Sequence, residues 1–292
     1  MRSATALAGA STANLGYGFD ILAVALDSPE LPRDRVTVEP AQRWQITVEG
    51  PAAEGVPTDP ERNGAVLAAR AITRRPHRIH LWKGLPPGSG LGSSAASCAA
   101  AAKAMAALHG FDGDLVAAAA EGERASAGVP HADNVGAALL GGLVCIADPA
   151  RSWPVPHHVA FALAIPQIEL TTRAMRRIVP KSWPRALHTS ETARAIATAV
   201  CLTRGEIENL PIRGSIVEKR RSRLIPNYRA VVRAAERAGA PAVTISGSGP
   251  TIVAIVDTRK TDAERVAKEM ARAFRVSARA VVAFAGEGAR IE

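Results

Sequence analysis

The stretch Lys83-Gly84-Leu85-Pro86-Pro87-Gly88-Ser89-Gly90-Leu91-Gly92-Ser93-Ser94-Ala95-Ala96-Ser97 runs directly into an alanine-rich segment that reaches His109. Gly88, Gly90 and Gly92 lack a Cβ atom, so the backbone can take positive φ angles and curl around a ligand. Ser93 and Ser94 are suitable N-caps, and alanine is the best helix former, which predicts a helix from here to His109. A glycine loop that opens a helix offers unpaired N–H groups and the positive end of the helix dipole. The stretch therefore predicts a phosphate-binding loop.

The spacing of this loop excludes two common nucleotide-binding motifs. No Gly-Lys-Ser/Thr follows the glycines, as a Walker A motif requires, and Gly-x-Gly-x-Gly lacks the third spacing of the dinucleotide fingerprint. A solvated Gly/Ser linker is the alternative interpretation. The abrupt change to alanine favours a helix packed closely under a nucleotide, because a linker would gain nothing from small apolar residues.

Length and composition bound the class of protein. With 292 residues and 47% hydrophobic content, the chain can form one large domain or two ordinary ones. It has no apolar run of membrane-spanning length and no signal-peptide pattern after Met1, so we expect a cytoplasmic protein without a membrane partner. Cys98, Cys145 and Cys201 are far apart and lack zinc-site spacing, which indicates buried thiols in a reducing compartment.

The net charge of +9 raises the alternative of nucleic-acid binding. Basic residues are scattered along the chain, apart from one cluster at Lys219 to Arg223, and aromatic residues make up only 4%. Stacking platforms for bases are therefore few. A small anionic substrate suits this charge equally well, so we expect no nucleic-acid partner and keep an RNA-binding protein as the alternative from another class.

Two further segments concentrate polar side chains in loops. Asn14 and Asp20 bracket two glycines, so a turn can bring an amide and a carboxylate to one side of a pocket. The alternative is that Asp20 N-caps a segment at 21–26. His131, Asp133 and Asn134 lie within four positions of another loop, where an Asx-turn capping a helix at 135–140 explains Asp133 or Asn134 but does not require His131.

Periodicity predicts an α+β protein. In the first half we expect a strand at 5–10, a β-hairpin from 34–38 and 43–48, a helix at 63–73, a strand at 78–82, a helix at 112–126 and a strand at 142–147. A domain boundary is expected near 148–158, giving domains 1–150 and 151–292. The second half predicts strands at 159–165, 242–246, 251–257 and 278–284 and helices at 189–203, 225–238 and 262–274. Ser246-Gly247-Ser248-Gly249-Pro250 forms a second glycine-rich turn, able to brace the first.

Three segments in order resemble the three motifs of the GHMP kinase superfamily: 13–20, 86–96 and 246–250. The segments His131 to Asn134 and Arg223 to Tyr228 resemble the branch of that superfamily that phosphorylates L-homoserine on its side-chain hydroxyl. The resemblance implies a ribosomal protein S5 domain 2-like N-terminal domain, a ferredoxin-like C-terminal domain and an active site between them. It also implies ATP, Mg²⁺, a role in threonine biosynthesis and a homodimer.

The same resemblance implies roles for individual residues. The ATP phosphates are expected at Pro86, Pro87, Gly88, Ser89, Gly90, Leu91, Gly92, Ser93, Ser94, Ala95 and Ala96, with Asn63 near the adenine. Magnesium is expected at Glu123 with Ser93 or Ser94. The amino-acid substrate is expected at Asn14, Asp20, His131, Arg176 and Arg221.

Physical chemistry fits these assignments to an amino-acid substrate. An ammonium group needs a carboxylate such as Asp20, and a carboxylate is best held by a bidentate guanidinium from Arg176 or Arg221. Arg173, Arg177, Arg220 and Arg223 are adjacent candidates for that guanidinium. A kinase for mevalonate or shikimate remains the alternative, although such an acid has no use for Asp20.

Catalysis needs alignment and charge neutralisation more than a strong base. Asn134 is expected to orient the attacking hydroxyl of the substrate. Whether Asp133 acts as a base stays open.

Overall fold

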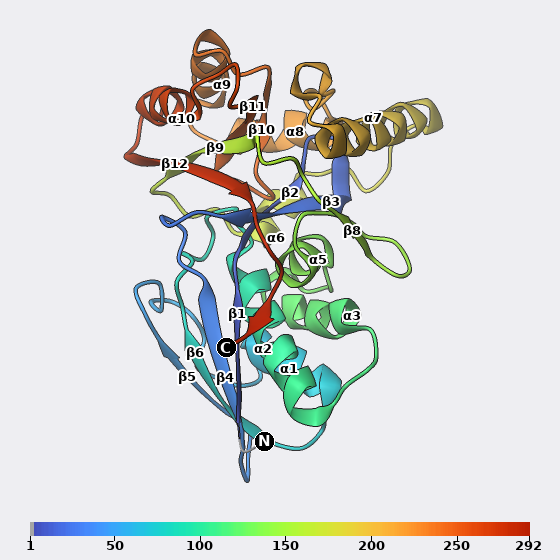
Figure 1. The fold of residues 1–292 in the computed structure, drawn as a ribbon, viewed down its shortest axis with the longest axis vertical. Helices are drawn as coiled ribbons and strands as arrows, with labels where there is room; N and C mark the ends of the chain where they lie inside the picture. The colour runs from blue at the N-terminus through green and yellow to red at the C-terminus, as the bar shows by residue number, and fades with distance from the viewer. Residues whose placement is uncertain (1–2) are drawn as a thin grey trace.

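The computed structural model describes residues 3–292 and contains two β-sheets in an elongated molecule, one in its lower half and one across its middle and upper half in Figure 1. The first sheet has five strands in the order β13-β1-β4-β6-β5. Their bounds are β1 Ala4–Ala8, β4 Asp34–Pro40, β5 Gln45–Glu49, β6 His77–Trp82 and β13 Arg290–Ile291. All neighbours are antiparallel except β5, which runs parallel to β6. The predicted hairpin is therefore wrong, since β6 lies between the two strands that were expected to pair.

Helices cover one face of this sheet, and α2 (Ser93–His109) is the central one. It contacts α1 (Gly64–Ile72), α5 (Asp133–Leu140), β1 and β4. The alanines of its first two turns are fully buried, because their small side chains let the neighbouring elements pack closely against the helix. The helix ends as predicted, with Gly110 as C-cap at φ 63°.

The second sheet has eight strands, in the order β10-β11-β9-β12-β3-β7-β8 with β2 paired to β3. Their bounds are β2 Ala10–Asn14, β3 Gly18–Asp27, β7 Leu143–Cys145, β8 Arg151–Trp153, β9 Val159–Pro166, β10 Ala242–Ile245, β11 Ile252–Asp257 and β12 Ala278–Ala285. Strand β9 is buried along its whole length. Alternate side chains of β9 enter two different cores, Phe161 and Leu163 one and Ala162 and Ala164 the other.

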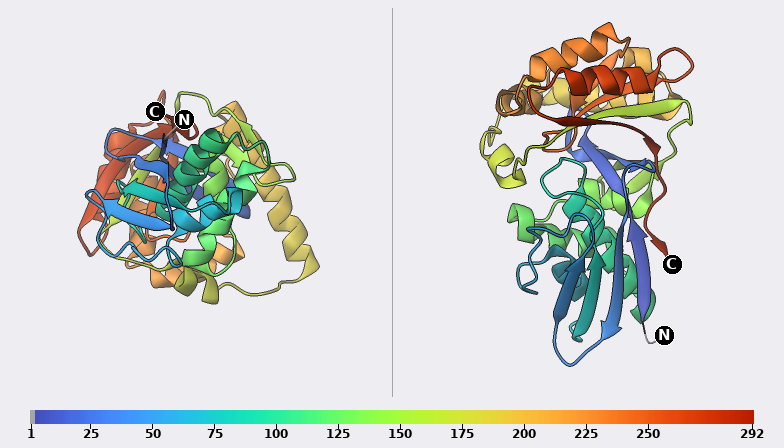
Figure 2. Two further views of the ribbon diagram at one scale, coloured as in Figure 1. Left: turned by 90° about the horizontal axis from the view of Figure 1, so that it is seen from below. Right: turned by 90° about the vertical axis from the view of Figure 1, so that its left-hand side faces the viewer.

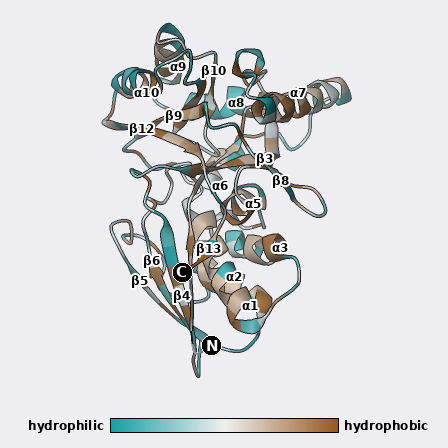
Figure 3. Cartoon of the chain, viewed as in Figure 1, coloured by the Kyte–Doolittle hydropathy of each residue, from teal (hydrophilic) through white to brown (hydrophobic). Residues whose placement is uncertain are grey.

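The second core lies under α9 (Tyr228–Arg237) and α10 (Ala263–Arg272), whose outer faces are hydrophilic (Figure 3). The long helix α7 (Arg185–Arg204) extends sideways from the same end of the molecule (Figure 2). Among residues 3–292, no helix combines the length and the apolar character that crossing a membrane requires.

Several predicted elements change their bounds or type. Residues 21–26 belong to β3, so Asp20 does not N-cap a helix. The helix expected at 112–126 is divided into α3 (Leu115–Ala120), a 3₁₀ turn at Glu121–Glu123 and α4 (Arg124–Ala127). Two short helices were not predicted, α6 (Thr172–Arg177) and α8 (Ile216–Arg221), since six residues are too few for a visible period.

The two sheets exchange strands between the halves of the chain. Strands β2 and β3 come from the N-terminal half but lie in the second sheet, and β13, at the C-terminal end, pairs with β1 in the first. The α+β architecture is as predicted, while the division of the chain at residue 150 stays a prediction.

Candidate active site

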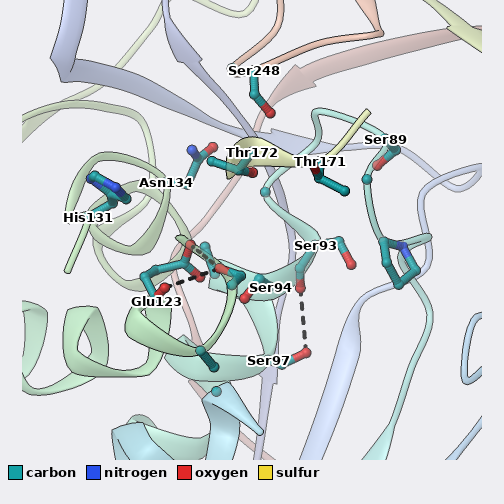
Figure 4. Close-up of a pocket in the computed structure, with 18 of the residues that line it drawn as sticks. Ser89, Ser93, Ser94, Ser97, Glu123, His131, Asn134, Thr171, Thr172 and Ser248 are labelled. Carbon is teal, nitrogen blue, oxygen red and sulfur yellow. Dashed lines mark hydrogen bonds between the residues drawn. The ribbon is translucent and has the colours of Figure 1, made fainter. Parts of the chain in front are cut away.

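A pocket of about 340 Å³ lies between the two sheets, where the glycine loop, α2 and the polar loops of both halves meet (Figure 4). Most residues singled out from the sequence line it: Asn14, Asp20, Asn63, Pro87, Gly88, Ser89, Gly90, Gly92, Ser93, Ser94, Ala95, Glu123, His131, Asp133, Asn134, Arg176 and Arg221. Three of the expected phosphate-loop residues, Pro86, Leu91 and Ala96, are outside the lining. Leu91 and Ala96 are buried in the core instead, because they anchor the loop from behind.

The glycine loop has the left-handed backbone that its sequence predicts. Gly88, Gly90 and Gly92 have φ angles of 67°, 81° and 67°. Gly92 itself is the N-cap of α2, and no side chain bonds to the cap, so the prediction that Ser93 or Ser94 caps the helix is wrong. The first-turn N–H groups of α2 therefore have no side-chain acceptor and remain available to an anion.

The second glycine turn braces the first one, as expected. Ser246 Oγ donates to the Gly90 carbonyl at 2.7 Å, and Thr251 Oγ1 donates to the Ser89 carbonyl at 2.7 Å. The approach is so close that a Cβ atom on Gly90 would lie 2.7 Å from the Gly249 carbonyl oxygen. Two glycine-rich segments that are distant in sequence thus form one rigid wall.

Asn63, at one end of the pocket, has its amide already engaged. Its Oδ1 accepts from the Ala65 N–H at 2.9 Å, which caps α1, and its Nδ2 donates to the Pro57 carbonyl at 2.6 Å. The side chain therefore fixes the loop at Val56 and Pro57, which also lines the pocket.

Glu123 and Ser94 face each other beside the start of α2 (Figure 4). Burial raises the pKa of Glu123, while the Ser94 and Ser126 hydroxyls oppose that rise by hydrogen bonding to the carboxylate. Within residues 3–292 no cluster of three His, Cys, Asp or Glu side chains surrounds a metal position. Mg²⁺ usually takes one or two protein carboxylates and fills its other positions with phosphate and water, so this donor set fits magnesium held jointly with a nucleotide.

The opposite end of the pocket is built from charged side chains. Arg176 on α6 holds Asp20 with two hydrogen bonds of 2.6 and 3.0 Å, and its third contact is His131 Nδ1 at 3.0 Å. Arginine has no acceptor, so His131 Nδ1 accepts and its proton is on Nε2. Burial and the adjacent Arg176 lower the pKa of His131, in agreement with a neutral ring. Asp20 holds this position with a left-handed φ of 62°.

Arg221 approaches the same cluster from α8. It is 2% exposed and donates to the carbonyls of Gly247, at 2.8 Å, and Met175, at 3.3 Å. The guanidinium groups of Arg176 and Arg221 lie 5.4 and 5.2 Å from the centre of the Phe19 ring, where cation–π attraction holds both. The neighbouring arginines at 173, 177, 220 and 223 are exposed and do not line the pocket.

Asp133 and Asn134 begin α5 between the two ends of the pocket. The helix starts at Asp133 with Ala132 as its N-cap, so the alternative interpretation, in which Asp133 or Asn134 caps a helix that begins at 135, does not hold. Burial, together with the nearby Asp20 carboxylate, raises the pKa of Asp133 to about 6. Asn134 Oδ1 accepts from Ser11 Oγ at 2.9 Å, which fixes the direction of its amide.

Sequence reasoning missed other residues of this site. Lys83 was part of the opening motif but received no role, and it lies buried under the loop. Glu169, Thr171 and Thr172 line the pocket, Glu169 next to Gly88, and the Phe19 ring contacts both arginines. Of these residues, only Lys83 could have been singled out from the sequence. It lies between a predicted strand and the glycine loop, where a buried ammonium group would need an acidic partner.

Comparison with known proteins identifies the class that this fold and site define. Family models for the N-terminal and C-terminal domains of GHMP kinases match residues 63–142 and 204–276. The chain therefore belongs to the GHMP kinases and is an ATP-dependent kinase.

Within this superfamily the chain is a member of the homoserine kinases. It is 42% identical to the homoserine kinase of Halobacterium salinarum, over 92% of this chain and 89% of that one. It is 37% identical to the enzyme of Methanocella arvoryzae, over 100% and 98%. The crystal structure of homoserine kinase from Cytophaga hutchinsonii matches with a TM-score of 0.88 at 30% identity, covering 100% of this chain and 98% of that chain.

Proposed function

We propose that the pocket transfers the terminal phosphoryl group of ATP to the side-chain hydroxyl of L-homoserine, forming O-phospho-L-homoserine for threonine biosynthesis. One observation carries the proposal: a single pocket joins an uncapped helix N-terminus under a glycine loop to a partly buried cluster of one carboxylate and two guanidinium groups. The first feature suits phosphates and the second suits a zwitterionic amino acid.

The nucleotide is assigned to the end formed by the glycine loop and α1. The first-turn N–H groups of α2 and the loop from Gly88 to Gly92 would surround the phosphates, and the helix dipole would favour their charge. The adenine would lie against the loop that Asn63 fixes through Pro57. Asn63 then acts by shaping the adenine end rather than by offering its amide.

Glu123 would hold magnesium, assisted by the hydroxyl of Ser94 or Ser93. Ser94 is favoured, because its hydroxyl lies near the Glu123 carboxylate and lowers the pKa of that group, whereas the Ser93 hydroxyl donates to the Leu85 carbonyl at 2.7 Å. When bound, the ion supplies neutralisation of the charge on the phosphates. A positive ion beside Glu123 would also favour its ionised form against the effect of burial.

The amino-acid substrate is assigned to the charged end. Its ammonium group would pair with Asp20 and its carboxylate with Arg176 and Arg221, so substrate would join the existing Asp20–Arg176 pair into a larger network. The His131 Nε2–H group, buried and without a partner among residues 3–292, would donate to an oxygen of the substrate. Asn14 fixes this corner by donating to the Gly247 carbonyl at 2.8 Å and accepting from the Asp20 N–H at 3.1 Å.

Asn134 and Asp133 lie between the two assigned ends, where the hydroxyl must meet the phosphoryl group. Asn134, held by Ser11, would orient that hydroxyl. Asp133 can accept its proton only in the ionised form, which predominates above about pH 6 because the pKa of Asp133 is raised to about 6. Base catalysis by Asp133 remains a hypothesis within this proposal.

The proposal includes a cytoplasmic homodimer. Helix α7 exposes Ile196 and Val200, one turn apart and 61% and 41% accessible. Covering such an apolar strip would favour association of two copies. Light scattering after size-exclusion chromatography distinguishes one copy from two.

The deciding experiment measures ADP release from ATP and MgCl₂ with L-homoserine, in parallel with mevalonate, shikimate, L-serine and L-threonine. We expect turnover with L-homoserine alone, and a phosphomonoester signal in ³¹P NMR of the product. Turnover with mevalonate or shikimate alone would retain the nucleotide end and overturn the assignment of the charged end.

A further inference from the structure

A buried carboxylate lies under the glycine loop, outside every role assigned above. Asp34, the first residue of β4, is fully buried. Its Oδ1 accepts from the N–H groups of Gly84 and Leu85 at 2.9 and 3.2 Å. Its Oδ2 accepts from Ser97 Oγ at 2.6 Å and from Lys83 Nζ at 2.5 Å. All four bonds lead to the two segments that flank the loop.

Lys83 completes the connection. Its side chain is 3% exposed, and its ammonium group donates to the Ser93 carbonyl at 2.9 Å as well as to Asp34. Burial lowers the pKa of Lys83, and the Asp34 charge opposes this effect. The pair is neutral as a whole, so it adds no net charge beneath the phosphates.

These contacts join the beginning of the loop to its end. Gly84 and Leu85 precede the loop, while Ser93 and Ser97 lie in the first two turns of α2 after it. Ser93 Oγ donates back to the Leu85 carbonyl at 2.7 Å. Both ends of the loop at residues 86–92 are thus held by one buried polar cluster, formed by Asp34, Lys83 and Ser97. This cluster fixes the direction of the first turn of α2.

We propose that Asp34 and Lys83 are positioning residues for the nucleotide, which hold the glycine loop and the N-terminus of α2 in the geometry that binds phosphates. Neither side chain would contact the phosphoryl group being transferred. The inference rests on the proposed ATP site but not on the identity of the acceptor. A pair with only a structural role would be replaceable by neutral groups of similar size at little cost, because a buried ion pair adds little net stability.

The test compares Lys83→Met, Asp34→Asn and the double variant, using the affinity for MgATP measured by calorimetry without acceptor, both KM values, and the melting temperature. We expect the MgATP affinity of Lys83→Met to fall about ten- to a hundredfold, the effect of losing charged hydrogen bonds. The KM for L-homoserine should stay within about twofold of the wild type, because additivity holds for sites without shared partners. In the double variant we expect the melting temperature to recover while the MgATP affinity stays low.

Asp257→Asn is the matched control. Asp257 is also a buried carboxylate with a cationic partner, Arg259, but it does not line the pocket. The Asp257→Asn substitution should lower the melting temperature and leave the KM values for ATP and for L-homoserine unchanged. If Lys83→Met does not fold, the double variant and Ser97→Ala, which removes one bond to Asp34, give the same comparison.

Two outcomes would overturn the inference: wild-type MgATP affinity in a folded double variant, or equal rises in both KM values. The positioning role of Asp34 and Lys83 can also be tested separately from the proposed function. A wild-type protein that binds MgATP but does not phosphorylate L-homoserine contradicts the acceptor assignment and leaves the positioning role to be judged by affinity alone.

Discussion

The two ends of the pocket are constructed in opposite ways. The phosphate end is made of backbone, with three left-handed glycines, a helix start and two buried serine and threonine bonds to the loop carbonyls. The acceptor end is made of long side chains from four separate segments, which meet around Asp20 and Phe19. The phosphate end is specified by local sequence and should tolerate no added atoms. The acceptor end depends on charge pairing, so substitutions there should reduce selectivity for the acceptor substrate gradually.

Gly90→Val should have the largest effect. A Cβ atom there would meet the Gly249 carbonyl oxygen at 2.7 Å, and valine disfavours a φ of 81°. We expect MgATP affinity to fall more than about a hundredfold, together with a loss of stability of several kcal/mol, typical of overpacking plus backbone strain. The fold cannot remain undisturbed, because the clash is with the second glycine turn. Calorimetry and thermal unfolding measure both quantities.

Gly110→Val is the control for that substitution. Gly110 has a similar φ of 63°, but nothing lies within 4 Å of its added Cβ. It should lose stability without losing MgATP affinity. Wild-type affinity in a folded Gly90→Val protein would exclude the phosphate-loop assignment.

Arg176→Lys should affect the acceptor end alone. Lysine keeps the charge but cannot make the two-point contact with Asp20 and the third with His131. We expect the KM for L-homoserine to rise about ten- to a hundredfold, as for loss of one or two charged hydrogen bonds, with the KM for ATP nearly unchanged. Steady-state kinetics with each substrate varied in turn measures this split.

Arg173→Lys, one turn away on the exposed face of α6, is the matched control and should be silent. If the two variants behaved alike, the charged cluster would have no part in recognising the acceptor.

Asp133→Asn should change stability in a pH-dependent way. The pKa of Asp133 is about 6 in the folded protein and 3.8 in the unfolded reference, so the folded state binds more protons between these values. Stability should therefore fall as pH rises from about 4 to 6, by up to about 3 kcal/mol. Asparagine lacks this loss, so the variant should be more stable than the wild type at pH 8 and equal to it near pH 3.

Urea unfolding of the wild type and the variant across that pH range measures the difference between their free energies of unfolding. If this difference did not change with pH, the Asp133 carboxyl group would be solvated in the folded protein. The same variant also tests catalysis. Nearly unchanged turnover would rule out Asp133 as the base.

Asn63→Ala should have the smallest effect. It removes the N-cap of α1 and the bond to the Pro57 carbonyl, so we expect a loss of about 1 kcal/mol in the free energy of unfolding. The KM for ATP should rise only severalfold, because the adenine end is shaped by backbone. An unchanged free energy of unfolding would contradict the capping role, and Asp114→Ala, at the N-cap of α3 away from the pocket, shows the size of a cap alone.

The sequence by itself determined the phosphate end, because positive φ, helix propensity and the spacing of glycines are properties of neighbouring residues. It also singled out most of the polar residues at the acceptor end. What it did not determine was their pairing. Asp20 and Arg176 were assigned to opposite charges of the substrate, and only the tertiary structure shows that they already bond to each other across 156 positions.

The tertiary structure likewise decided the strand order and the buried support of the loop. The alternation of side chains predicted β4 and β5 as strands, but a period of two does not reveal which strands pair with each other. The position of β6 between them could therefore not be predicted. Asp34 appeared as an ordinary strand residue. Its role arises only when β4, Lys83 and α2 come together, because a buried carboxylate is tolerated only where donors from all of these elements reach it.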